Sequence, residues 1–142
     1  MWADDLLVAE RAHLLRLGAW GAASLLAGTA LLAWLLLARH RSDLLRHFAI
    51  QTAAWGAVDL AIAAISWTTI TTPDLAGATR LDRVLWLNIG LDGGYVMVGV
   101  ALALTGWRLG RRVGLVGAGT GVVVQGSALA LLDLMLASHI SR

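Results

Sequence analysis

The chain has 142 residues, of which 58% are hydrophobic and only 14% are charged. A soluble domain of this size carries about 25% charged residues, so the composition argues against one and indicates lipid as the solvent. The formal net charge is only +2 and the basic residues lie between apolar runs, which excludes a nucleic-acid-binding patch. The absence of cysteine excludes disulfides, thiolate metal sites and cysteine nucleophiles.

Residues 1–13 are predicted to form an amphipathic N-terminal segment. Asp4, Asp5 and Glu10 are interspersed there with Leu and Val, which is typical of a helix that lies in the membrane interface or extends the first span. The acids occupy positions where a cleavable signal peptide needs positive charge, so none is expected.

Four long apolar runs follow, separated by short polar turns. A transmembrane helix needs about 20 mostly apolar residues, and each run is long enough, whereas the alternation typical of strands is absent. We therefore predict a single membrane domain, residues 1–142, folded as an all-α four-helix transmembrane bundle. The predicted spans lie near 14–38, 46–71, 84–107 and 112–138.

The arginine distribution gives an expected orientation. The turns after the first and third spans hold six arginines and one acid, against five arginines and five acids on the opposite side. Because positive charge is denser in the two short turns, we expect these turns in the cytoplasm and both termini in the periplasm. All basic residues are Arg and the chain is rich in Ala, Leu and Gly, which favours a bacterial cytoplasmic (inner) membrane and a multi-pass protein.

Tryptophans mark the expected ends of the spans. Near one end lie Trp20, Trp67 and Trp86, and near the other lie Trp34 and Trp107. This is the pattern of an aromatic belt at each membrane surface. Trp55 is the exception, because it falls in the middle of its span.

Polar residues recur at helical spacing inside three of the spans. The second span carries Gln51, Trp55 and Asp59, the third carries Asn88, Asp92 and Tyr95, and the fourth carries Gln125 and Asp133. At 100° per residue each set shares one face of its helix. A carboxylate in mid-span costs roughly 2.5–3.5 kcal/mol, so we expect these faces to meet in the bundle interior.

The depth of these residues supports a common cluster. Asp92 and Asp133 lie at the same distance from the charged ends of their helices, and Arg16 enters the first span from that side. Three ionised carboxylates would repel, so either Arg16 neutralises them or some hold a proton. Because the turn between the third and fourth spans is short, we expect Asp92 and Asp133 to face each other there, with the second span completing the ring.

Two functions of different class remain open for this cluster. Intramembrane polar residues often serve only as hydrogen-bonding contacts between helices, which favours a non-enzymatic accessory or interaction subunit. The alternative is a protein that binds or transports a proton, an ion or a small solute through the buried carboxylates. Besides the lipid bilayer, the expected partner is a second copy or another subunit of a membrane complex.

Catalysis and metal or cofactor binding are not expected. His13, His40, His47 and His139 are scattered over the chain, and no nucleophile lies beside a base. No cofactor motif is present either, because the glycine-rich stretch 117–121 follows no strand and lacks the lysine of a phosphate loop. Its Gly117-x3-Gly121 pair instead predicts close helix packing.

A short internal sequence repeat favours two duplicated helical hairpins. Gln51-x7-Asp59-Leu60 recurs as Gln125-x7-Asp133-Leu134, 74 residues later. Two spans separate the copies, so both have the same orientation, as in a parallel repeat. Chance is the competing explanation, since few positions match.

Three stretches carry a family resemblance: residues 47–67, 87–102 and 125–134. Their most specific part is Leu-Asn-x-Gly-Leu-Asp-x-Gly-Tyr, residues 87–95. In these stretches the chain resembles a family of small, uncharacterised bacterial membrane proteins. The resemblance implies a four-helix membrane protein, and it implies no substrate and no mechanism. Family members often have Asn at the position of Asp59, so the resemblance does not require a carboxylate there.

Overall fold

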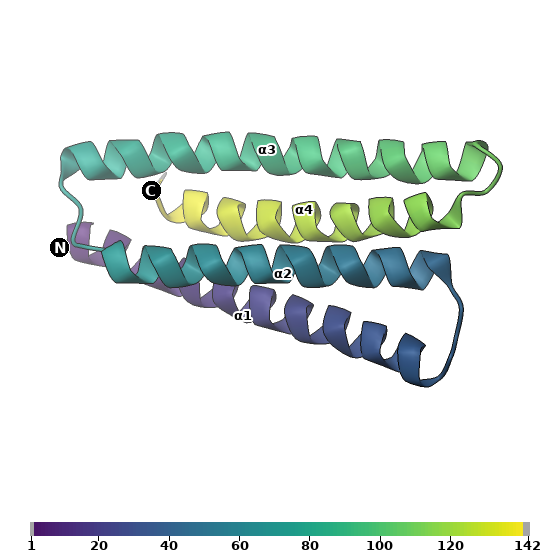
Figure 1. Cartoon of the computed structure of the whole chain (residues 1–142). Coiled ribbons are helices and arrows are strands. Elements are labelled where there is room, and N and C mark those ends of the chain that lie inside the picture. Colours follow the sequence, from purple (N-terminus) through teal and green to yellow (C-terminus); the bar gives the residue numbers. More distant parts are fainter. Residues whose placement is uncertain (1, 141–142) are drawn as a thin grey trace.

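The computed structural model describes residues 2–140, which form four helices joined by short turns (Figure 1). The helices are α1 (Trp2–Leu37), α2 (Asp43–Thr69), α3 (Leu75–Arg108) and α4 (Val113–Ile140). The described residues contain no strand, which confirms the all-α prediction. All four helices are long and apolar enough to cross a membrane.

Local sequence signals set the helix ends. The Ser42 hydroxyl accepts a hydrogen bond from the Leu45 amide and starts α2, while the Asp74 carboxylate accepts one from the Gly77 amide and starts α3. These are N-caps, which satisfy backbone donors that lack a partner inside the helix. Pro73 precedes the second cap, where a helix cannot continue. Each turn therefore ends one helix and begins the next within a few residues.

Two helices begin well before the predicted spans. Helix α1 runs unbroken from Trp2, so the described part of the predicted segment 1–13 extends the first helix; Met1 lies outside the described residues. Helix α3 begins at Leu75, although the predicted span begins at 84. Hydropathy marks only the apolar part of a helix, whereas capping and hydrogen bonding continue it into polar sequence.

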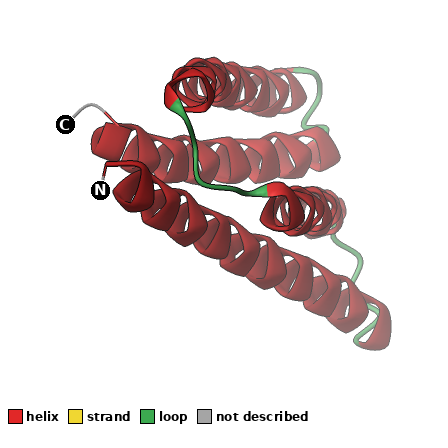
Figure 2. Ribbon diagram, turned by 90° about the vertical axis from the view of Figure 1, so that its left-hand side faces the viewer, coloured by secondary structure: helices red, strands yellow, loops and turns green. Residues whose placement is uncertain are grey.

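The helices form two antiparallel hairpins that meet along α2 and α4. Helix α1 packs along α2, α3 packs along α4, and α2 packs on α4, while α1 also reaches α4. In Figure 2 the two hairpins lie one above the other. Helix α4 is thus the only described helix whose backbone comes close to that of all the others, and the termini lie at one end of the bundle (Figure 1).

Small residues at heptad spacing form the helix contacts. In α3 the buried positions are Leu85, Asp92, Gly99 and Gly106, one every seven residues. In α2 they are Ala49, Thr52, Gly56, Asp59 and Ala63, three or four apart. Such spacing is typical of helices packed at a shallow left-handed angle, and small side chains allow the close approach common between membrane helices.

Glycine contacts hold each hairpin together. A Cβ at Gly28 would lie 2.6 Å from the backbone nitrogen of Ala53 on α2, and one at Gly99 would lie 2.7 Å from the Gly119 carbonyl oxygen on α4. The predicted close packing of Gly117 and Gly121 is confirmed, because Cβ atoms there would clash with Leu44 and Gln51 of α2. Large apolar side chains instead point outward, Leu36, Leu37 and Met97 among them.

Candidate intramembrane polar site

Three carboxylates from three helices are buried in the bundle. Asp59 of α2, Asp92 of α3 and Asp133 of α4 expose only 1%, 5% and 8% of their surface. Asp92 is close enough to both Asp59 and Asp133 to interact with them electrostatically. Each occupies a heptad contact position or the inner face of its helix, so the folding of the bundle forces the three groups together. We call Asp59, Asp92 and Asp133 the carboxylate triad.

Two of these carboxylates lack hydrogen-bond partners. Asp59 Oδ2 and Asp92 Oδ2 are fully buried, and within residues 2–140 neither accepts a hydrogen bond. A buried polar atom left unpaired costs roughly 1–3 kcal/mol, and more when it is charged. Native proteins tolerate few such atoms. These two unpaired oxygens therefore oppose the stability of the bundle.

Asp133 has a partner from the first helix. His13 Nε2 lies 3.4 Å from Asp133 Oδ1, and both side chains are buried. The imidazole can share a proton with the carboxylate or carry a compensating positive charge. This pair lies toward the end of the bundle that holds the termini, and it connects the triad to α1.

The side-chain oxygen and nitrogen of Gln125, by contrast, both form hydrogen bonds. The Trp20 indole Nε1 donates to Gln125 Oε1 at 2.7 Å, and Gln125 Nε2 donates to the Ser24 hydroxyl at 3.1 Å. Gln125 and Ser24 are buried. The amide thus joins α4 to α1 in the way expected of a structural contact between membrane helices.

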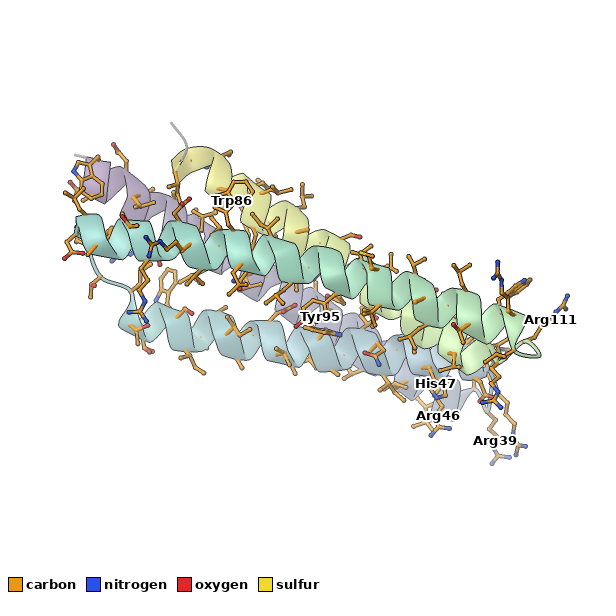
Figure 3. All side chains as sticks on the ribbon, turned by 90° about the horizontal axis from the view of Figure 1, so that it is seen from above. Arg39, Arg46, His47, Trp86, Tyr95 and Arg111 are labelled. Atoms are coloured by element: carbon orange, nitrogen blue, oxygen red, sulfur yellow. The ribbon has the colours of Figure 1, made fainter. Side chains whose placement is uncertain are left out.

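The second helix adds an aromatic contact. The Trp55 ring meets the Tyr95 ring edge-on at a centroid distance of 5.0 Å. Tyr95 lies midway along the bundle, at its surface (Figure 3). Gln51 is half-buried and packs near Gly121 of α4. These side chains fill the space where α2 and α3 do not touch by backbone.

Three predicted members of the site, Tyr95, Asn88 and Arg16, lie at the surface of the bundle. Asn88 is exposed, which corrects the prediction that the whole polar face of the third span points inward. The reason is that, among the described helices, the backbone of α3 comes close only to that of α4, so a narrow strip of one residue in seven is buried. Arg16 is also exposed and forms no ion pair within residues 2–140, so His13 and not Arg16 is the basic neighbour of the triad.

The side chains that bond to the fourth helix come from α1 and were not predicted. Gln125 and Asp133 contact Trp20, Ser24 and His13, while Asp133 also lies near Asp92 of the third span, as the sequence predicted. The spacing of 7 and 4 residues puts these three on one face of α1, a signal that reading each residue alone misses. Trp20 in particular was expected in an aromatic belt.

The arrangement favours protons over metal ions. Within residues 2–140 no group of three or more His, Cys, Asp or Glu side chains is placed to hold a metal ion. Clustered carboxylates and an imidazole in an apolar interior can instead bind, share and release protons. Three of the site residues that the sequence identified, Asp59, Asp92 and Asp133, form this cluster, whereas Gln125 is buried as a contact between α4 and α1.

Comparison with known proteins identifies a family whose function is unknown. The DUF6992 family, a family of unknown function, matches residues 16–134. The match covers α2 and α3 completely and α1 and α4 in large part, and it extends beyond the three resembling stretches. No curated protein and no solved structure matches the chain.

Proposed function

We propose a function from the geometry alone, because the chain belongs to the DUF6992 family, a family of unknown function. The protein is a multi-pass, non-enzymatic protein of a bacterial cytoplasmic membrane, and its carboxylate triad binds protons inside the bilayer. The observation that carries the proposal is the pair of buried oxygens, Asp59 Oδ2 and Asp92 Oδ2, that accept no hydrogen bond within the described chain.

The contrast with Gln125 supports a site over a purely structural role. If the polar stripes served only to join helices, each group would be paired, as Gln125 is by Trp20 and Ser24. Asp59 is as deeply buried as Gln125 and is unpaired. Ionisable residues retained in a membrane at such cost are usually functional.

His13 supplies the other half of a proton-binding site. It lies next to Asp133, and Asp133 interacts electrostatically with Asp92, which interacts with Asp59. A proton on Asp92 changes the charge felt by Asp59 and by Asp133, so the protonation of these carboxylates depends on one another. Together with His13, they extend from α1 through α4 and α3 to α2.

Charge removal at constant shape tests the proposal. Asp59→Asn, Asp92→Asn and Asp133→Asn keep the size of each side chain, and the exposed Asp43→Asn is the matched control. Infrared difference spectra of the reconstituted protein should contain a carboxylic-acid C=O band that shifts with pH. The band should lose intensity in each triad variant and remain in the control. A spectrum unchanged in all three triad variants would contradict proton binding.

A second candidate function is that of an interaction subunit, and the outer face of α3 favours it. Cβ atoms built at Gly90 and Gly94 would meet nothing within 4 Å. At 100° per residue these glycines lie opposite Asp92, on the face turned away from α4. A small-residue pair on an exposed, apolar helix suits close packing against a second copy of α3.

A larger side chain on this face of α3 tests whether the protein is an interaction subunit. Gly94→Leu should leave the monomer folded, because nothing lies near the position, but should reduce dimer formation measured by single-molecule photobleaching in liposomes. Leu104→Val, on an exposed part of the same helix, is the control. A wild-type protein that stays monomeric at high protein-to-lipid ratio would exclude this function without affecting the triad.

A further inference from the structure

A pocket opens at the end of the bundle opposite the termini, between the last turns of α1 and the first turns of α2. Its volume is about 890 Å³. Leu32, Leu36 and Ile50 form apolar walls, and Arg39, Arg41 and Arg46 line it as well. Figure 3 shows Arg39 and Arg46 at this end of the molecule. The pocket thus combines an apolar surface with a concentration of positive charge.

The position of these residues along the helices matches the layers of a membrane. Leu32 and Ile50 lie within the apolar parts of α1 and α2, while Arg39 and Arg41 lie in the turn between the helices. Hydrocarbon borders the first pair and lipid headgroups border the second. A molecule filling this pocket would meet leucines at its apolar end and guanidinium groups at its polar end.

The guanidinium groups are available to a ligand. None of Arg39, Arg41 and Arg46 forms an ion pair within residues 2–140. One acid, Asp43, also lines the pocket, so three positive charges face one negative charge. Arg111, in the turn between α3 and α4, is different because its guanidinium lies 5.3 Å from the centre of the Trp107 ring.

The backbone at Arg39 is strained. Its φ of 51° is in the left-handed region, where helix ends usually have glycine. At the end of α3 the chain does have a glycine there, Gly110, with a φ of 68°, and Arg111 follows it at 57°. At the end of α1 no glycine precedes Arg39. A glycine at either arginine would therefore relieve the backbone, so substitution by glycine removes the guanidinium group without adding strain.

We propose that this pocket binds one anionic phospholipid. The phosphate lies against Arg39, Arg41 and Arg46, since guanidinium groups bind phosphate through paired charge-assisted hydrogen bonds. An acyl chain lies along Leu32, Leu36 and Ile50. The apolar walls favour a lipid over a free phosphate ion, which would gain nothing from them. This inference does not depend on the carboxylate triad.

Native mass spectrometry of the full-length protein tests the proposal, with phosphatidylglycerol as the probe and phosphatidylcholine as the neutral comparison. The wild type should retain one phosphatidylglycerol molecule in preference to phosphatidylcholine. Arg39→Gly should bind it about tenfold more weakly, the loss expected for one charged hydrogen-bond pair. Arg39→Gly also relieves the left-handed backbone, so its thermal unfolding midpoint should be equal to or above that of the wild type. Arg46→Gln, a substitution on α2, should weaken phosphatidylglycerol binding to a similar extent.

Arg111→Gly is the matched control, because it removes the same charge from the same end and the same strained conformation. It should bind the lipid as the wild type does. Equal losses in Arg39→Gly and Arg111→Gly would mean general surface attraction and would overturn the proposal. Equal retention of phosphatidylglycerol and phosphatidylcholine by the wild type would also overturn the proposal. Displacement of phosphatidylglycerol by millimolar inorganic phosphate would identify a soluble anion site and overturn it as well.

Discussion

At the scale of single residues, Asp59 and Gln125 show that burial alone does not define a role. Both are almost fully buried and both are polar. Gln125 has a donor and an acceptor partner on α1, whereas Asp59 Oδ2 has none in the described chain. Pairing therefore separates a structural contact from a candidate site, because it decides whether a buried group stabilises the fold or opposes it.

Opposite effects on stability are expected from substituting these two residues. Gln125→Leu leaves the Trp20 indole and the Ser24 hydroxyl without partners and should lower stability by about 1–2 kcal/mol. Asp59→Asn removes an unpaired buried charge and should raise stability by on the order of 1 kcal/mol. Unfolding in mixed micelles with increasing SDS measures both. A destabilised Asp59→Asn would mean that the carboxylate has a structural partner after all.

The inward placement of the triad could be predicted from sequence, but its neighbours could not. Residues spaced at helical intervals share a face whatever surrounds them, so Asp59, Asp92 and Asp133 were expected inside. Whether a face is covered depends on how many helices adjoin it. Asn88 is only four residues from Asp92 and is exposed, because α3 has one helix beside it.

At the scale of helices, glycine determines how the elements pack. Gly56 of α2 lies against the backbone of α1 at Gly21 and Leu25, so no larger side chain fits there. The number, order and type of the helices followed from apolar runs and caps. The sequence did not predict in full which faces meet, because the helices are apolar around most of their circumference and hydropathy gives no direction there. Small residues carried that information, as Gly117 and Gly121 show.

A matched pair of glycine substitutions distinguishes the packed faces from the open one. Gly56→Ala places a Cβ 2.7 Å from the Gly21 carbonyl oxygen, which should destabilise the bundle by about 1–3 kcal/mol through overpacking. Gly90→Ala meets open space and should be neutral or stabilising by up to about 1 kcal/mol through helix propensity. Unfolding by SDS followed by circular dichroism gives both values, and equal effects would refute the assigned packing.

At the scale of the whole molecule, four helices with both termini at one end imply that the turns alternate between two sides of a membrane. The arginine-rich turns 38–42 and 109–112 lie at the end opposite the termini (Figure 1). The connection at 70–74 lies at the end of the termini. The side that faces the cytoplasm is a prediction from arginine density alone.

Labelling of single cysteines tests this topology without background, because the chain has no native cysteine. Arg41→Cys and Leu109→Cys, both exposed, should react with a membrane-impermeant maleimide from one side only. Thr72→Cys should react from the other side. The predicted orientation makes Thr72→Cys the one labelled in intact cells. Reaction of Arg41→Cys and Thr72→Cys from the same side would contradict four crossings.

The glycine contacts within each hairpin have a consequence for biogenesis. Close glycine contacts join α1 to α2 and α3 to α4, and further ones at Gly117 and Gly121 of α4 join the two pairs through α2. The contacts between the pairs, including the hydrogen bonds of Gln125 to Trp20 and Ser24, should therefore hold the two halves together without the connection at 70–74. A chain cut in that connection should still assemble when residues 1–72 and 73–142 are co-expressed as separate fragments that insert into the membrane independently.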